Sequence, residues 1–225
     1  MKVCIIIPVY NEARMIGKIV EEIKARSWDV IVVNDGSTDL SGGIAKEKGA
    51  FVIDHREKQG KGVSLRDGFS CALSQGFDGV IAMDGDGQHH IDDIESFMVK
   101  ARQYPDSIIS GNRMLDCKHM PLIRRFVNRM MSLMISSICH QSIPDSQCGF
   151  RFISASILRS IVLTSSNFEI ETEIFIKASR KGFKIHSIPV QTIYRDELSK
   201  INPFVDTFRF FRYILKELIG SRSST

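Results

Sequence analysis

The chain has 225 residues and a formal net charge of +4, from 30 Lys and Arg against 26 Asp and Glu. At roughly 150 residues per domain, this length corresponds to one large domain or to one domain with an extension, and it suffices to bury a full core. The apolar fraction of 43% is ordinary for a globular protein, so composition excludes a disordered, collagenous or histone-like chain. The small positive excess gives no reason to expect a nucleic-acid partner.

Cysteine usage and hydropathy indicate the compartment. The five cysteines are odd in number and widely spaced, and they contain no C-x-x-C pair of the kind that zinc or redox sites use. No segment approaches the ~18 uninterrupted apolar residues of a membrane span, and the first residues lack a signal-peptide pattern. We therefore expect reduced thiols in a cytoplasmic protein that at most lies on a membrane surface.

The first 111 residues alternate short apolar runs with helical patterns, which is typical of a parallel α/β sheet. The expected strands cover residues 3–9, 30–33, 51–53, 80–83 and 108–110, and the expected helices follow the first strand and lie near residues 39–48, 62–75 and 91–103. Each strand ends in a polar loop. Because ligands of such sheets bind at the carboxyl ends of the strands, these loops are the candidate site.

The pattern changes beyond residue 111. A basic, methionine-rich segment runs to about residue 140, a helical stretch covers about residues 168–180, and a strand is expected near residues 183–190. No low-complexity linker interrupts the chain. We predict one domain over residues 1–203, with halves at 1–111 and 112–203, followed by an amphipathic segment at 204–225.

Two carboxylates, Asp84 and Asp86, stand two positions apart at the end of an expected buried strand. In an extended segment beside a glycine, both can face one hard cation, which in turn neutralises a diphosphate. A solvated turn is the commoner explanation of an isolated D-x-D. A calcium-binding EF-hand loop is excluded, because His89 stands where that loop needs glycine and a strand precedes it.

Residues 35–39, Asp-Gly-Ser-Thr-Asp, follow the second expected strand. Capping of the next helix explains Ser37, Thr38 and Asp39. It explains Asp35 less well. A carboxylate at the carboxyl end of a strand can instead meet a ribose hydroxyl or a base.

Together these motifs closely resemble the family 2 glycosyltransferases of the GT-A fold. The residues that carry the resemblance are 8–12 (PVYNE), 33–39 (VNDGSTD) and 84–89 (DGDGQH), in that order and spacing on three strand ends. Further matches at 111–113 (GNR), 145–151 (DSQCGFR) and 195–200 are similar to the dolichol- and polyprenyl-phosphate mannose synthase branch. The match covers about residues 3–203. It implies an α/β fold with a mostly parallel central sheet flanked by helices.

The resemblance also implies a donor, a nucleotide-diphosphate sugar held with Mg²⁺ or Mn²⁺. Positions matching the base and ribose site are Pro8, Tyr10, Glu12 and Asp35; Lys61 lies in a glycine-flanked basic turn near the nucleotide, and Asp84, Gly85 and Asp86 lie at the diphosphate. Asp84, Asp86 and Gln88 are the implied metal ligands, with Asp86 also catalytic. Taken alone, the turn at Lys61 is equally consistent with a helix start.

A polyprenyl-phosphate acceptor is already ionised near neutral pH, so its attack needs cationic positioning and no general base. The candidate acceptor-binding residues are Arg113, Arg124, Arg125, Arg195, Ser199 and Lys200, with Arg113 also counted as catalytic. A guanidinium can grip a phosphate bidentately, although any single Arg is also consistent with a solvated surface charge. Residues 195–200 are one residue shorter than the branch pattern R-x-x-G-x-S-K and lack its glycine.

With a hydroxyl acceptor, a carboxylate would have to deprotonate the nucleophile, and Asp145 or Glu171 are the candidates. On a helix, Glu169 and Glu173 share a face and Glu171 points roughly opposite. The same acidic run is also consistent with a solvated helix start, which the helix dipole favours.

Two stretches have the pattern of amphipathic helices that lie in a membrane interface. Residues 122–138 mix apolar side chains with Arg124, Arg125 and Arg129, and the tail places Phe204, Phe208, Phe211 and Leu215 on one face and Arg209, Arg212 and Lys216 on another. Packing against the core or a dimer contact explains the amphipathic pattern of the tail equally well, so an oligomer is also consistent with the sequence. Residues 113–129 contain five cations and one anion, which accounts for the whole net charge.

The sequence thus predicts a metal-dependent inverting glycosyltransferase. It would move a hexose from GDP-mannose or a UDP-sugar to a polyprenyl phosphate, as a peripheral protein on the inner face of the membrane. The first alternative is a hydroxyl acceptor. A sugar nucleotidyltransferase would need a glycine-rich, basic loop after the first strand, and residues 8–12 are neither. A catalytically silent nucleotide-binding module fits poorly with an intact Asp84 and Asp86 pair.

Overall fold

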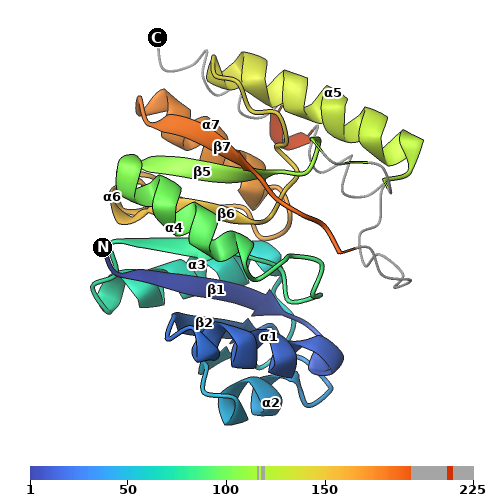
Figure 1. The fold of residues 1–225 in the computed structure, drawn as a ribbon, viewed down its shortest axis with the longest axis vertical. Coiled ribbons are helices and arrows are strands. Elements are labelled where there is room, and N and C mark those ends of the chain that lie inside the picture. Colours follow the sequence, from blue (N-terminus) through green and yellow to red (C-terminus); the bar gives the residue numbers. More distant parts are fainter. Residues whose placement is uncertain (116, 118–119, 194–211, 215–225) are drawn as a thin grey trace.

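The computed structural model describes residues 1–115, 117, 120–193 and 212–214, where a seven-stranded sheet has helices on both faces (Figure 1). The strands are β1 (Val3–Val9), β2 (Asp29–Asn34), β3 (Phe51–Asp54), β4 (Gly79–Ala82), β5 (Ser107–Asn112), β6 (Arg151–Ser154) and β7 (Lys184–Pro189). The helices are α1 (Ala13–Ala25), α2 (Ser41–Glu47), α3 (Lys61–Ser74), α4 (Asp93–Gln103), α5 (Leu122–Cys139), α6 (Ala155–Ser160) and α7 (Ile170–Arg180).

The strand order is β3-β2-β1-β4-β6-β5-β7. Strands β1 to β4 are parallel where they pair, as are β5 and β7, whereas β6 runs antiparallel to both β4 and β5. Because β1, β2 and β4 point the same way, the loops that follow them meet at one edge of the sheet.

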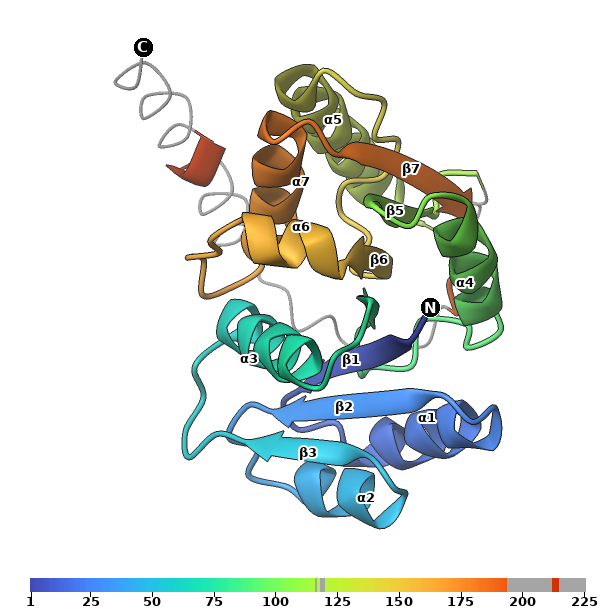
Figure 2. The same cartoon turned by 90° about the vertical axis from the view of Figure 1, so that its left-hand side faces the viewer.

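Side chains of β1 alternate between two apolar cores, one on each face of the sheet. Cys4 and Ile6 belong to the core shared with α3 and α7, whereas Ile5 and Ile7 belong to the core shared with α1 and α4. Figure 2 shows α3 and α1 on opposite sides of the strands. Helix α3 approaches closely at Gly68, where an added Cβ would lie 2.5 Å from Ile6 Cγ2. Burial on both faces explains why this strand is a continuous apolar run.

Helix α5 packs by one side only. Its residues Met131, Ile135 and Cys139 join the core that α7 also contributes to. Its other side carries large apolar side chains that are 44–81% exposed, namely Leu122, Ile123, Phe126, Met130 and Leu133. Among the helices that the structure describes, none combines the length and apolarity needed to cross a membrane.

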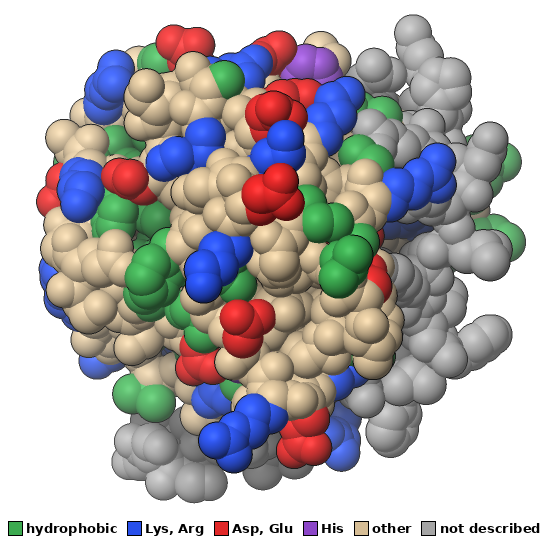
Figure 3. Space-filling view, turned by 90° about the horizontal axis from the view of Figure 1, so that it is seen from below, with side chains coloured by type: hydrophobic (Ala, Val, Ile, Leu, Met, Phe, Trp, Pro, Cys, Tyr) green, Lys and Arg blue, Asp and Glu red, His purple; other side chains and the backbone are tan. Residues whose placement is uncertain are grey.

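The far end of the molecule has a different surface. In Figure 1, α5 lies at the top and α2 at the bottom. Seen from below, the described surface intersperses Lys and Arg with Asp and Glu and shows only scattered apolar side chains (Figure 3). On this face, the exposed apolar side chains therefore lie among charged ones, whereas α5 presents five of them on one helix.

The expected elements of the first 111 residues are confirmed, and the ends of those given bounds shift by at most two residues. The helix near residues 168–180 and the strand near 183–190 are confirmed as α7 and β7. Sequence analysis missed β6 and α6, because β6 has only four residues and begins with Arg151, and α6 has only six. In the tail, Arg212 is exposed while Tyr213 and Ile214 are buried in the core to which α3 and α7 also contribute.

Candidate active site

The three polar motifs of the sequence do meet at the carboxyl ends of β1, β2 and β4. Asp35 N donates to Val9 O (2.8 Å), which joins the ends of β1 and β2. Met83 N donates to Ile6 O (3.0 Å), so Asp84 emerges beside β1. Gly85 lies against β1, because a Cβ there would be 2.7 Å from Val9 Cγ1.

The loop after β2 caps helix α1. Asn11 N donates to Ser37 Oγ (3.0 Å), Glu12 N to Ser41 Oγ (2.8 Å) and Ala13 N to Asp39 Oδ2 (3.1 Å). We expected Ser37, Thr38 and Asp39 to cap the following helix. Of these, Asp39 Oδ1 accepts from Ser41 N (3.0 Å) at the start of α2. The Ser37 and Asp39 side chains also bond the segment that opens α1, so the expectation was incomplete.

Asp35 is held by the protein through both carboxylate oxygens. Its Oδ1 accepts from Gln59 N (2.8 Å) and contacts His55 Nδ1 (2.9 Å), and its Oδ2 accepts from Gly60 N (2.9 Å). Burial works to raise the pKa of Asp35, but these hydrogen bonds outweigh it and hold that pKa below its usual value. Asp35 therefore fastens the loop that leads into Lys61.

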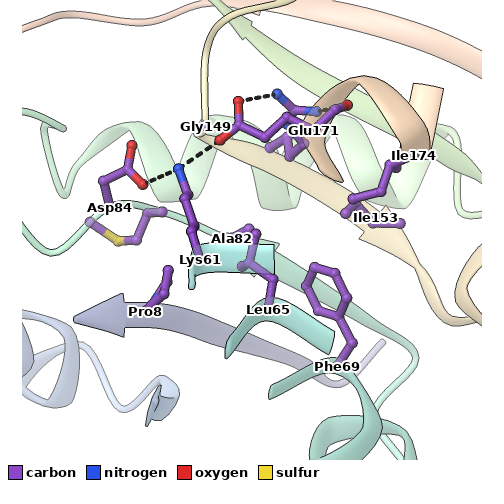
Figure 4. A pocket seen from close by; sticks show the side chains of 12 residues that line it. Pro8, Lys61, Leu65, Phe69, Ala82, Asp84, Gly149, Ile153, Glu171 and Ile174 are labelled. Atoms are coloured by element: carbon purple, nitrogen blue, oxygen red, sulfur yellow. Dashed lines mark hydrogen bonds and ion pairs between the residues drawn. The ribbon is translucent and has the colours of Figure 1, made fainter. Parts of the chain in front are cut away.

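Lys61 is the centre of a chain of charges that spans the sheet edge (Figure 4). Its Nζ lies 2.5 Å from Asp84 Oδ1 and 2.6 Å from Glu171 Oε1, and Glu171 Oε2 lies 3.2 Å from Arg151 Nη2. Burial alone would lower the pKa of Lys61, but the two neighbouring carboxylates raise it above its usual value. The same ion pair holds the pKa of Asp84 well below its usual value against the effect of burial.

Glycines make room for this arrangement. Gly60 has φ +105, in the left-handed region that favours glycine, and a Cβ on Gly62 would lie 2.5 Å from Ser165 O. Gly62 N donates to Ser166 O (2.8 Å), which fixes the start of α3 against that loop. Gly149 lies over the charges, since its Cβ would be 2.8 Å from Asp84 Oδ2.

Arg151 is a site residue that sequence analysis did not single out. Only 1% exposed, it donates from Nη1 to Glu171 O (2.8 Å) and from Nε to Cys148 O (3.2 Å), and it lies 4.4 Å from the Phe175 ring centroid. An arginine inside an otherwise apolar run was the available signal, because a buried arginine needs partners.

Arg113 and Asp145 form a buried two-point ion pair. Arg113 Nε lies 2.8 Å from Asp145 Oδ2 and Nη2 lies 3.0 Å from Oδ1, while the backbone N of Arg113 also donates to Oδ2 (3.1 Å). Asp145 Oδ1 accepts from Gln147 N as well (3.2 Å). The two carboxylates expected as candidate bases, Asp145 and Glu171, are thus both counter-ions of buried cations.

The remaining expected acceptor residues lie either on α5 or outside the residues that the structure describes. Arg124 and Arg125 lie on α5, half-buried and exposed respectively. Arg195, Ser199 and Lys200 lie outside the described residues, as do the apolar residues expected on the tail helix.

Asp84 and Asp86 suit a hard cation that a substrate helps to hold. The pKa of Asp86 is raised by burial and by the charge of Asp84, which is a repulsion that a cation would relieve. His89 is 6% exposed, and neither ring nitrogen has a hydrogen-bond partner; its Nε2 lies 3.6 Å from Asp84 Oδ2. Gln88 lies half-buried, and its backbone N donates to Asp86 Oδ1 (2.9 Å).

Within the described part of the chain, no group of three or more His, Cys, Asp and Glu side chains could hold a metal by itself. Mg²⁺ typically binds one or two carboxylates and takes its remaining ligands from water and substrate phosphates. The donor set at Asp84 and Asp86 therefore fits a metal that is bound together with a phosphate compound.

The strand order and the carboxylate pair after β4 define a GT-A glycosyltransferase fold. Among solved structures, glucosyl-3-phosphoglycerate synthase from Mycobacterium tuberculosis, in complex with Mn²⁺, UDP and glucosyl-3-phosphoglycerate, has a TM-score of 0.71 and 15% identity. The alignment covers 97% of this chain and 79% of that one. Residues 4–162 match the family model described as glycosyl transferase family 2. The chain belongs to this family, so the predicted fold and enzyme class are confirmed.

Two sequence relatives have named acceptors. The UDP-N-acetylglucosamine–dolichyl-phosphate N-acetylglucosaminyltransferase of Methanococcus voltae is 29% identical over 215 residues, which cover 85% of this chain and 86% of that one. The undecaprenyl-phosphate mannosyltransferase of Micrococcus luteus is 26% identical over 208 residues, covering 87% and 85%.

Proposed function

We propose that this enzyme transfers a hexose, with inversion, from a nucleotide-diphosphate sugar to a polyprenyl phosphate. The relatives named for dolichyl and undecaprenyl phosphate support the acceptor class. One observation of the site carries the proposal: Asp145 and Glu171, the candidate bases, are both bound to buried cations.

The donor lies against the ends of β1, β2 and β4. Pro8, Tyr10 and Glu12 border the base and ribose. Asp35 contributes indirectly: its hydrogen bonds to Gln59 N and Gly60 N hold the loop that positions Lys61 near the diphosphate.

The reaction must stabilise a departing nucleoside diphosphate. A divalent ion, Mg²⁺ or Mn²⁺, held by Asp84, Asp86 and Gln88 would supply Lewis-acid charge to that leaving group. Lys61 adds a fixed positive charge in a buried site, where electrostatic interactions are stronger than in water.

The acceptor's chemistry follows from the charge pairs. A hydroxyl nucleophile needs a base with an accessible lone pair, whereas both oxygens of Asp145 and both of Glu171 lie within 3.2 Å of a cation. A phosphate monoester needs no base. Asp145 binds Nε and Nη2 of Arg113 and so fixes the orientation of the guanidinium group. We propose that the edge that includes Nη1 binds the acceptor phosphate. Arg124, Arg125, Arg195, Ser199 and Lys200 are the further candidates on the acceptor side.

We also propose that α5 rests on the inner membrane face. Leu122, Ile123 and Phe126 are 66–81% exposed on its first turns, and the exposed Arg125 and Arg129 border them. Exposed apolar side chains beside basic ones favour an interface with anionic lipids. Ser132 on α5 accepts a hydrogen bond from Ser146 N (2.9 Å), next to Asp145, so this placement brings a lipid phosphate toward the site.

The central experiment is a donor screen. Purified enzyme is incubated with GDP-mannose or UDP-sugars, Mn²⁺ and either a polyprenyl phosphate or the matching prenol, and sugar-lipid product is measured. Transfer to the phosphate, with none to the prenol, is expected. Faster transfer to the prenol, lost in Asp145→Asn or Glu171→Gln with a changed pH profile, would contradict the phosphate acceptor and restore a base.

Membrane binding is tested separately with vesicles that contain anionic lipid. The double variant Ile123→Ser with Phe126→Ser should co-sediment less with vesicles. The matched control is Val162→Ser, because Val162 is 77% exposed but lies outside α5. Equal binding of both variants would exclude α5 as the contact.

A further inference from the structure

Lys61 forms an ion pair with Asp84, so a divalent ion that bound Asp84 would compete with the Lys61 ammonium group for the same carboxylate. We propose that Lys61 couples metal binding to nucleotide binding: it neutralises Asp84 while the donor is away, so that the divalent ion binds well only together with a nucleoside diphosphate. This inference rests on the proposed metal-dependent transfer.

Proximity makes the competition direct. Lys61 Nζ lies 2.5 Å from Asp84 Oδ1, and the Lys61 side chain is only 14% exposed. A divalent ion on Asp84 and Asp86 would therefore lie close to an ammonium group with little water between them. Repulsion between like charges at such distances is strong in a poorly solvated site.

The ammonium group cannot simply withdraw. Lys61 is the first residue of α3, and the packing of Gly60 and Gly62 against residues 165–167 fixes its backbone. Glu171 Oε1, 2.6 Å from Lys61 Nζ, would still hold the lysine side chain in place when Asp84 binds the divalent ion. A lysine in the first turn of a helix also opposes the helix dipole, so its position depends on these carboxylates.

Charge balance explains why the metal and the diphosphate favour each other's binding. Asp84, Asp86 and Glu171 contribute three negative charges against two positive charges from Lys61 and Arg151, which leaves one net negative charge when all are ionised. A divalent ion alone would make the cluster positive. The negative charges of a diphosphate reverse that sign and give Lys61 a new partner, so metal and diphosphate strengthen each other's binding.

The test measures Mn²⁺ binding to the full chain by electron paramagnetic resonance of free Mn²⁺, with and without GDP or UDP. We expect Lys61→Met to bind Mn²⁺ alone about tenfold more tightly, and Mn²⁺ with the diphosphate about tenfold more weakly. These opposite changes are the signature of coupling, because damage to the fold would weaken both. The control is Lys18→Met, since Lys18 is 68% exposed on α1, and it should change neither.

A second variant guards against loss of folding in the first. Glu171→Gln removes a negative charge beside Lys61 and should weaken binding of Mn²⁺ alone, opposite to Lys61→Met. Unchanged binding in both variants, or changes of one sign in Lys61→Met, would overturn the coupling. If the wild-type protein bound no Mn²⁺ even with either diphosphate, the proposed metal-dependent function would fail instead.

Discussion

The two halves of the site are held together by different interactions. In the half built on β1 to β4, several side chains bond backbone amides, as Asp35 does with Gln59 N and Gly60 N and as Ser37 does with Asn11 N, although Lys61 and Asp84 also form an ion pair there. In the half built on β5 to β7, side chains pair with side chains: Arg113 with Asp145, 32 positions apart, and Arg151 with Glu171, 20 apart.

The difference matters because the two kinds of contact fail differently. A backbone amide keeps its place when one side chain changes, so a single polar substitution in the first half should cost less stability than the loss of one partner of a buried ion pair, about 2 kcal/mol where buried amides lose their acceptor. A buried ion pair that loses one partner leaves an uncompensated charge in the core. The first half should therefore show its importance in catalysis, and the second half in catalysis and stability together.

The largest effect is expected at Asp86, at the end of β4. Asp86→Asn should lower kcat/KM for sugar transfer about 1000-fold, because the proposed divalent ion, which would neutralise the leaving diphosphate, would lose one of its ligands. The free energy of unfolding should hardly change, since Asp86 accepts a single backbone hydrogen bond, from Gln88 N. Asp29→Asn is the control, because Asp29 is exposed at the start of β2. Undiminished transfer in Asp86→Asn would contradict the metal mechanism.

The same contrast explains what could be predicted from the sequence. Each parallel strand buried on both faces is an apolar run followed by its own polar loop, so β1, β2 and β4 and the meeting of their motifs were predictable. Strand β6 was not, because its neighbours are distant in sequence and it begins with a buried arginine. The ion pairs were not predictable either, since no periodicity records which arginine meets which carboxylate.

Asp145→Asn should have the next largest effect, this time on stability. Arg113 is 8% exposed and would lose its counter-ion, a change that costs about 3–5 kcal/mol of unfolding free energy. Urea denaturation followed by circular dichroism measures it. Replacing both partners, Arg113→Leu with Asp145→Leu, should recover much of the stability but no transfer. If Asp145→Asn were as stable as Asp86→Asn, the proposed contrast between the halves would be wrong.

The dependence of stability on acid pH compares the two halves through one buried carboxylate from each, Asp35 and Glu173. The pKa values of Asp35 and Glu173 are both lowered, although burial of each carboxylate works to raise its pKa. At Asp35, hydrogen bonds from backbone amides and the contact with His55 outweigh burial. At Glu173, Lys177 and two backbone amides do so. A lowered folded-state pKa contributes stability above the unfolded pKa, about 4, and loses it as pH falls through the folded value.

Asp35→Asn and Glu173→Gln should each cost about 2 kcal/mol at pH 7 and flatten the loss of stability toward pH 3. Only the effect of Glu173→Gln should shrink with added salt, because Lys177 Nζ, 2.6 Å from Glu173 Oε1, is partly exposed and screened. Urea titrations at two salt concentrations measure both. Equal salt dependence would mean that the amides and the ammonium contribute alike.

The smallest effect is expected at Gly149, a residue of the second half that lies close to Asp84 of the first half. A Cβ there would lie 2.8 Å from Asp84 Oδ2 and 3.1 Å from Glu171 Oε1, both at ends of side chains that can shift. Gly149→Ala should therefore fold normally and lower kcat/KM about tenfold, because Asp84 would move away from the proposed divalent ion. Gly43→Ala, where a Cβ meets nothing within 4 Å, should leave kcat/KM unchanged. Full activity in Gly149→Ala would show that the position of Asp84 does not depend on the second half.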